Sequence, residues 1–212
     1  MDNLDNLRIV IFDCDGVLFN SLRANTEFYN QIARCAGRDP LAMEELGYCH
    51  MHTAEESIRF IFRDKPELIE RAYDCYREMD YGDFLEYMEI EPSMVETVKA
   101  LRSRYYTAIS TNRSTTMPRL RQIYRLDDFF DKIVCALDVK NPKPHPEGVH
   151  LILKSFDLGP ENAVYIGDSK VDEEVSRNAK VPFIAYKNKA LHAMYHIEHF
   201  DELSSLLLRR EK

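Results

Sequence analysis

The chain has 212 residues, of which 45% are hydrophobic and 30% charged, and these values are typical of a globular protein that can bury a sizeable core. The formal net charge of −8 argues against non-specific binding to nucleic acid or anionic membranes, and no apolar run is long enough to span a bilayer. The start, MDNLDNLR, lacks the features of a signal peptide, so we expect a cytoplasmic protein, monomeric or weakly dimeric, with no membrane or nucleic-acid partner.

A short apolar run, Ile9 to Phe12, is followed at once by two aspartates and a glycine. The run is rich in β-branched residues and too short for a helix, so it predicts a central strand buried on both faces. Asp13 and Asp15 therefore stand at the carboxyl end of a strand, where open α/β sheets bind their ligands. Gly16 allows the chain to turn sharply away.

Residues 20–91 are predicted to be mostly helical, with no convincing strand. Helical spacing predicts a helix over 21–37 and a short one over 41–46, and we expect a loop over 47–52. The pattern Thr53-Ala54-Glu55-Glu56 predicts a helix that runs to about residue 63, and a further helix begins near Pro66. The segment is therefore predicted to be an inserted helical domain.

From Pro92 onward, predicted helices and strands alternate. The strands are expected over 106–110, 133–137, 163–166 and 183–186, with helices between them and a closing helix over 201–210. Such alternation indicates right-handed βαβ units and a parallel sheet, hence an α/β, Rossmann-like three-layer core formed by residues 1–19 and 92–212. A parallel sheet would bring to one edge the polar residues that follow its strands, namely Asp13, Asp15, Thr111, Asn112, Lys143 and Asp168.

Four short segments stand in order along the chain: FDCDGV at 12–17, TNR at 111–113, KPHPE at 143–147 and GDSKVD at 167–172. One such motif would be a weak signal, whereas four in order are specific. Together they resemble the haloacid dehalogenase-like phosphohydrolases, in the branch of phosphoglycolate phosphatase and β-phosphoglucomutase that carries a helical cap. The resemblance covers nearly the whole chain and implies a five-stranded sheet of order 5-4-1-2-3.

The resemblance implies a Mg²⁺-dependent enzyme that uses Asp13 as nucleophile and Asp15 as general acid and base. A phosphate dianion repels a carboxylate, so attack requires a cation that neutralises charge. The implied Mg²⁺ ligands are Asp13, the backbone carbonyl of Asp15, and Asp168. Asp172 is expected to orient a metal-bound water or Lys143.

Further residues are expected to bind the substrate or stabilise the transition state. Thr111, or alternatively Ser110, would donate a hydroxyl hydrogen bond to the phosphate, and Lys143 would place a point charge beside it. The loop over 47–52 matches the segment of the cap that selects substrates in this family. The expected substrate-binding residues are Gly16, Asn112, His50, His52 and Arg59.

Each motif also has an ordinary structural explanation. Asp15-Gly16 is a common turn pair, and Ser169 to Asp172 can be a plain helix cap. Lys143 between prolines can be a solvated loop residue, Thr111 after a strand can be a helix cap, and Arg59 can be a solvated helix residue. Convergence on one sheet edge outweighs these explanations for the principal acids and Lys143, but only weakens them for Thr111 and Asp172.

Three functions remain open from the sequence. The favoured function is hydrolysis of a small phosphorylated metabolite, a phosphate monoester, through an aspartyl phosphate. A sugar phosphomutase would return the phosphoryl group to its substrate instead of releasing inorganic phosphate. A silent binding protein would hold Mg²⁺ and phosphate without turnover.

Two further expectations concern the cysteines and the histidines at positions 192, 196 and 199. The five cysteines contain no CxxC pair, so we expect reduced thiols. His192, His196 and His199 are expected to be exposed histidines on a helix, not metal ligands.

Overall fold

The computed structural model describes residues 4–51 and 54–208, which gather into two compact units. The core unit contains the chain up to Asn20 and from Ile90 onward, and the helical unit contains Ser21–Glu89. Within the described ranges, no helix is both long and apolar enough to cross a membrane.

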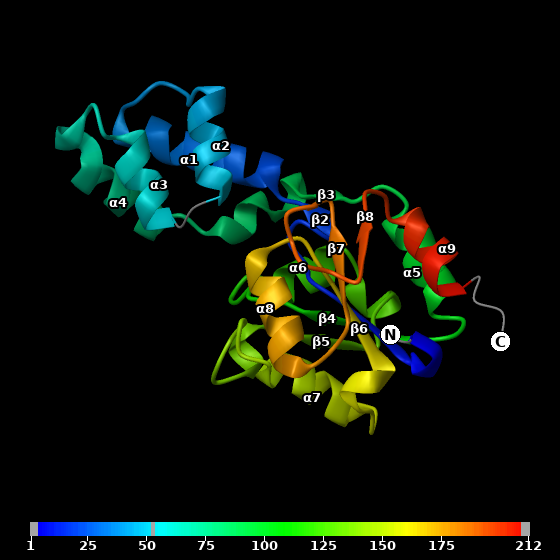
Figure 1. Ribbon diagram of the computed structural model, residues 1–212. Helices are drawn as coiled ribbons and strands as arrows, with labels where there is room; N and C mark the ends of the chain where they lie inside the picture. The colour runs from blue at the N-terminus through cyan, green and yellow to red at the C-terminus, as the bar shows by residue number, and fades with distance from the viewer. Residues whose placement is uncertain (1–3, 52–53, 209–212) are drawn as a thin grey trace. The chain divides into compact units, whose positions relative to one another are not determined.

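A parallel sheet forms the centre of the core unit (Figure 1). Its six strands run in the order β5-β4-β1-β6-β7-β8. The first five of these reproduce the order 5-4-1-2-3, read from the opposite edge, so the expected α/β fold is confirmed. The strand bounds are β1 Ile9–Phe12, β4 Tyr106–Ser110, β5 Lys132–Val134, β6 Ala163–Gly167, β7 Phe183–Tyr186 and β8 Tyr195–Ile197.

The sixth strand was not predicted, and it corrects the expectation that the late histidines lie on a helix. His196 lies in β8, opposite Ala185 of β7, and its Nε2 is 2.9 Å from the Leu191 carbonyl oxygen. The strand has three residues, too few to show a period of two, so only its pairing with β7 reveals it.

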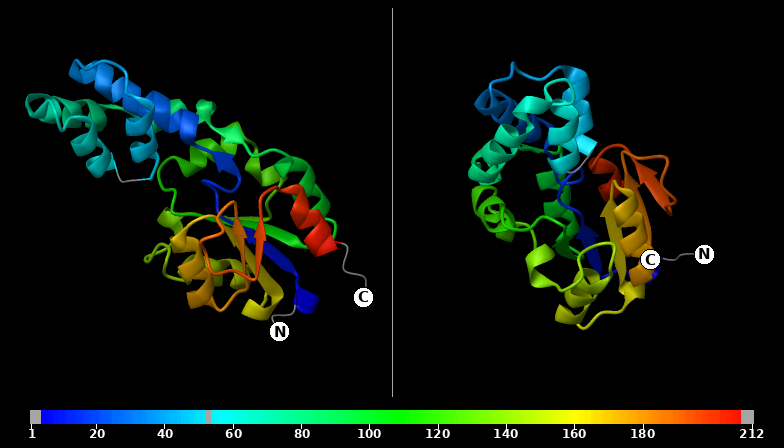
Figure 2. Two further views of the ribbon diagram at one scale, coloured as in Figure 1. Left: turned by 45° about the horizontal axis from the view of Figure 1, so that its top comes forward. Right: turned by 90° about the vertical axis from the view of Figure 1, so that its left-hand side faces the viewer.

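Helices cover both faces of the sheet, which makes the three layers that the alternation predicts (Figures 1 and 2). Helices α7 and α8 pack against the strands on one face, and α5 packs with α9 on the other. The bounds are α5 Met94–Leu101, α6 Met117–Ile123, α7 Glu147–Ser155, α8 Lys170–Ala179 and α9 Asp201–Leu208.

Strand β1 is completely buried, because its successive side chains point to opposite faces of the sheet and helices cover both faces. Ile9 and Ile11 join the apolar cluster that includes residues of α7 and α8. Phe12 points to the other face, where its ring lies 5.9 Å from those of Phe130 and Phe200. Burial of each such apolar side chain stabilises the fold by about 1.5–3 kcal/mol, so Asp13 directly follows a strand whose position is well determined by packing.

Among the described residues, the helical unit contains the α-helices α1 Leu22–Ala36, α2 Met43–Met51, α3 Ala54–Ile61 and α4 Ile69–Glu78. Helix α1 ends where the sequence predicts, at Gly37, whose φ of 89° suits glycine. A two-stranded ribbon, β2 Phe19–Asn20 with β3 Glu89–Ile90, lies where the chain enters and leaves this unit. The expectation of no strand over 20–91 was therefore wrong, because strands of two residues leave no pattern in a sequence.

The expected loop over 47–52 is also wrong for residues up to Met51, which belong to α2. Glycine inside a helix costs about 1 kcal/mol relative to alanine. Burial of Leu46 and Cys49 in the apolar cluster of this unit compensates for that cost.

Two cysteines form a disulfide, contrary to the expectation of reduced thiols. The bond joins Cys35 of α1 to Cys75 of α4, 40 residues apart, with a Cα–Cα distance of 6.1 Å. Spacing along the sequence cannot reveal such a pair, because only helix packing brings the two together. Cys14, Cys49 and Cys135 are free and buried.

Candidate active site

The carboxyl ends of three neighbouring strands bring the predicted acids and hydroxyls together. β1 pairs with β4 through Phe12 and Ile109, and with β6 through Phe12 and Ile166. The chain positions that follow these strands therefore lie at one edge of the sheet, as the sequence predicts.

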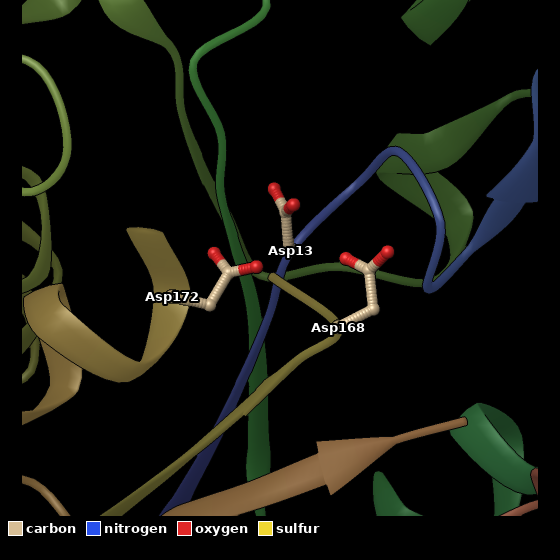
Figure 3. Close-up of side chains that lie close together, drawn as sticks. All are labelled: Asp13, Asp168 and Asp172. Carbon is tan, nitrogen blue, oxygen red and sulfur yellow. The ribbon is translucent and has the colours of Figure 1, made fainter. Parts of the chain in front are cut away.

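Three carboxylates converge at this edge, those of Asp13, Asp168 and Asp172 (Figure 3). One oxygen of each lies within 4.8 Å of the others. Asp13 follows β1, Asp168 follows β6, and Asp172 lies in the first turn of α8. Ser169 caps this helix, because its hydroxyl accepts from the Asp172 amide and the Asp172 carboxylate accepts from the Ser169 amide.

Lys143 lies among these acids with only 6% of its side chain exposed. Its Nζ is 2.8 Å from Asp13 Oδ1 and donates to Asp172 Oδ1 at 2.7 Å. It also donates to the Tyr165 hydroxyl at 3.2 Å. Tyr165, from β6, in turn donates to the Ser110 carbonyl at 2.9 Å, which fixes its ring at the bottom of the site.

The loop that carries Lys143 is held by Asn112. The Asn112 side chain accepts from the Lys143 amide and donates to its carbonyl, both at 2.9 Å. Asn112 therefore positions the lysine through its side chain, while the expected contact of this residue with substrate stays a prediction.

Burial governs the ionisation of this cluster. It raises the pKa of Asp13 from 3.8 to about 7, against the opposing charge of Lys143, and raises the pKa of Asp168 to about 6. Burial would lower the pKa of Lys143, but the surrounding acids, above all Asp13, raise it well above its usual value. The site thus holds one fixed positive charge among three carboxylates.

Asp15 is not part of this cluster of three acids; it pairs with Arg113, for which no role was predicted. The Arg113 Nε donates to Asp15 Oδ2 at 3.1 Å, and its Nη2 donates to Asp15 Oδ1. Gly16 follows with a φ of 78°, and a Cβ there would collide with the Asp168 carboxylate. Glycine is therefore required on both counts. Arg113 completes the TNR segment, so its place in that motif was the available signal.

Both hydroxyl candidates at the end of β4 are buried. Thr111 accepts a hydrogen bond from the Arg113 amide at 3.1 Å, an arrangement that leaves its hydroxyl proton available to donate. A Cβ on Gly148 of α7 would lie 3.3 Å from the Ser110 Oγ, so this hydroxyl faces the packed helix. Thr111 therefore has a hydroxyl proton free to donate at this edge of the sheet, whereas Ser110 is packed against α7; phosphate binding by Thr111 stays a prediction.

The substrate-binding residues predicted in the helical unit are His50, His52 and Arg59. His50 lies in α2, and His52 lies outside the described residues. Arg59 lies on α3 with 68% of its side chain exposed and pairs with Glu55 at 2.9 Å. Substrate contact by these three residues stays a prediction.

The acidic cluster fits a magnesium ion. Carboxylate oxygens are the ligands that Mg²⁺ prefers. Asp13 Oδ1 is buried and, among the described residues, accepts no hydrogen bond, because the nearby Lys143 ammonium is poorly aligned with it. This oxygen has Lys143 as its charged neighbour but uses none of its lone pairs in a hydrogen bond, so they remain available to a cation. Asp172 already holds Lys143 and Ser169, so Asp13 and Asp168 are better placed as direct ligands.

The architecture is that of a Rossmann-like α/β protein with an acidic site at the carboxyl edge of its sheet. The model of the haloacid dehalogenase-like hydrolases matches residues 10–186. The chain therefore belongs to this family of hydrolases.

Relatives of known structure or activity share most of their length with this chain. A HAD-superfamily hydrolase of subfamily IA, variant 1, from Geobacter sulfurreducens PCA is 36% identical, with a TM-score of 0.88 over 95% of this chain and 97% of that one. Pyrophosphatase PpaX from Bacillus cereus (strain B4264) is 29% identical over 184 residues, 82% of this chain and 80% of the relative. A haloacid dehalogenase-like hydrolase from Streptococcus pneumoniae, 21% identical, shares the fold with a TM-score of 0.76 over 95% of this chain and 98% of that one.

Proposed function

We propose that the chain is a Mg²⁺-dependent phosphohydrolase that cleaves a small phosphorylated metabolite, a phosphate monoester, through an acyl phosphate on Asp13 (an aspartyl phosphate). The observation that carries the proposal is the cluster of Asp13, Asp168 and Asp172 around the buried Lys143, with Asp15 two residues beyond the nucleophile. A purely structural site would not hold three acids against one lysine, because burying unbalanced charge destabilises a fold.

In the first step, a carboxylate oxygen of Asp13 attacks phosphorus. As the bond to the leaving oxygen breaks, the Asp15 carboxyl group gives its proton to that oxygen. Lys143 stabilises the charge on the phosphoryl oxygens, and the Thr111 hydroxyl donates to one of them. Bound Mg²⁺ would reduce the repulsion between Asp13 and the phosphate.

In the second step, water attacks the phosphorus of the aspartyl phosphate. The Asp15 carboxylate takes a proton from that water, inorganic phosphate leaves, and the Asp13 carboxylate is restored. General acid and base catalysis of this kind typically contributes about 10²–10⁴-fold to the rate.

Pyrophosphate belongs among the first substrates to test, because PpaX relatives from Bacillus are named for that activity. Phosphoglycolate, sugar phosphates and nucleoside phosphates complete the panel. The matched experiment measures release of inorganic phosphate with Mg²⁺ and with a chelator, for wild type and for Asp13→Asn, with thermal melting as the control for folding.

We expect release that requires Mg²⁺ and is lost in folded Asp13→Asn. Release that is equal with chelator, or equal in Asp13→Asn, would refute the proposal. Transfer of the phosphoryl group between positions of a sugar, without release, would identify a mutase instead.

A further inference from the structure

Arg113 is almost buried, with only 7% of its side chain exposed, and its guanidinium is held along its whole edge. Nε and Nη2 donate to the two oxygens of Asp15, and Nη1 donates to the Thr116 hydroxyl at 3.0 Å. Its backbone is held as well: the amide donates to the Thr111 hydroxyl, and the carbonyl accepts from the Ala136 amide at 3.0 Å. The arginine is therefore fixed at both ends.

Asp15, by contrast, has 38% of its side chain exposed and precedes a glycine turn. A carboxylate in such a position would rotate among several orientations. Two parallel donors from one planar guanidinium select a single orientation, which a lysine ammonium cannot do. The pair therefore determines which way the Asp15 oxygens face.

A role in fold stability alone explains this pair poorly. An ion pair whose arginine is buried and whose aspartate is partly exposed gains little net stability, because desolvation of the arginine offsets the charge attraction, so the pair is weak evidence for a stabilising function. The partner of Arg113 is also no arbitrary acid, since Asp15 lies two residues after Asp13 and directly before the turn at Gly16.

We propose that Arg113 is a positioning residue for Asp15. It holds the carboxylate in the orientation from which Asp15 exchanges a proton first with the leaving group and then with water. This inference rests on the proposed phosphohydrolase function and deepens it. Arg113 acts through Asp15 and needs no contact with the substrate.

A double-mutant cycle tests whether Arg113 acts through Asp15. The variants are Arg113→Met, Asp15→Asn and the double variant, assayed for kcat and KM on a sugar phosphate, whose leaving group requires a proton. Misplacement of a catalytic group by about 1 Å can cost about 10²-fold, so we expect Arg113→Met to lower kcat by about 10–100-fold with KM changed less than about threefold. In the Asp15→Asn background, the same substitution should cost less than about threefold, because the group it positions is already lost.

Arg121→Met is the matched control. Arg121 also forms a two-pronged pair with an aspartate, Asp127, at 2.6 and 2.7 Å, but on an exposed surface of the core unit. This variant should leave kcat within about twofold of wild type, both alone and with Asp15→Asn.

Two further measurements separate positioning from general damage. On p-nitrophenyl phosphate, whose leaving group needs little protonation, Arg113→Met and Asp15→Asn should both keep most of the rate of Asp13 phosphorylation, seen as a burst of nitrophenolate, while the later release of inorganic phosphate is slowed as it is on the sugar phosphate. Arg113→Lys keeps the positive charge but cannot donate two parallel hydrogen bonds, so this variant should fold like wild type and still lose most of the kcat.

Full additivity of Arg113→Met with Asp15→Asn, or loss of the nitrophenolate burst in Arg113→Met, would overturn the positioning role while leaving the phosphohydrolase intact. Phosphate release that Asp13→Asn does not reduce would instead refute the proposed function itself, and the positioning role with it.

Discussion

The acidic cluster should destabilise the protein when no metal is bound, and Asp168→Asn isolates this effect. In the folded protein the pKa of Asp168 is about 6, against an ordinary value of 3.8, with burial as the main cause and the Asp172 charge as the next. A shift of about two units corresponds to about 3 kcal/mol. Because Asp168 is only partly buried, solvent reduces this figure, and we expect Asp168→Asn to raise the free energy of unfolding by about 1–2 kcal/mol at pH 7.5 in chelator.

The sign of the pH dependence follows from the direction of the shift. The folded-state pKa lies above the unfolded value, so between about pH 4 and 6 the folded protein binds more protons than the unfolded chain. Its free energy of unfolding therefore falls as the pH rises through that window. Asparagine cannot ionise, so the advantage of Asp168→Asn should shrink to roughly a third at pH 4.5.

Urea unfolding followed by circular dichroism, at pH 4.5 and 7.5 in chelator, measures these differences. Asp127→Asn, an exposed aspartate of the same unit, is the control and should change stability by less than about 1 kcal/mol. Added Mg²⁺ should stabilise wild type at pH 7.5 more than it stabilises Asp168→Asn. The reasoning is refuted if Asp168→Asn is no more stable than wild type at pH 7.5, or if its advantage does not shrink on acidification.

Three further predictions concern single features of the structure. Lys143→Met should lower kcat by about 10²–10³-fold, measured by phosphate release. It should also destabilise the protein in chelator by about 3–5 kcal/mol, because it leaves buried carboxylates unpaired. Urea unfolding measures the second effect, and unchanged stability would contradict the prediction. Gly16→Ala places a Cβ against the Asp168 carboxylate, at a φ of 78° that alanine rarely adopts. The Mg²⁺ affinity of this variant, measured by calorimetry, should therefore be at least about tenfold lower than that of wild type. An unchanged affinity would contradict the proposed ion site. The Cys35–Cys75 bond closes a loop whose ends are 40 residues apart and should stabilise the helical unit by about 4 kcal/mol. If the bond forms, unreduced denatured protein should titrate with three thiols, whereas five thiols would contradict it.

The sequence predicts those parts of the fold that repeat a clear local pattern. Strand β4 at Tyr106–Ser110 and strand β7 at Phe183–Tyr186 match their predicted bounds, and helix α8 at Lys170–Ala179 lies between two strands, where a helix was predicted. Each has enough residues to show a period, and turn or capping residues bound each one.

Features that arise from tertiary contact could not be predicted in this way. Strand β8 exists because it pairs with β7, and the glycine inside α2 is tolerated because its neighbours are buried. The Cys35–Cys75 bond depends on the packing of two helices that are far apart in sequence. Local pattern contains none of this information.

The same limit applies to the site. Asp13, Lys143 and Asp168 were predicted to meet because each follows a strand of one parallel sheet, and the structure brings them together. Asp172 was also expected beside Lys143, as an alternative to a metal-bound water, and it accepts from that lysine. Two other residues of the site were not foreseen. Arg113 lies inside a recognised motif but finds Asp15 across 98 residues, and Tyr165 looks like an ordinary strand residue until its hydroxyl is placed beside Lys143.

Direct detection of phosphate on Asp13 tests the central claim most directly. Asp15→Asn should slow hydrolysis of the aspartyl phosphate, so this variant, mixed with substrate and Mg²⁺ and quenched in acid, is the best source of the intermediate. Reduction of the acyl phosphate with borohydride followed by peptide mapping would locate it. We expect the modification at Asp13, and its loss when Asp13→Asn is added. Substrate turnover by wild type with no modification at Asp13 in the trapped variant, or with modification of another residue, would contradict the mechanism.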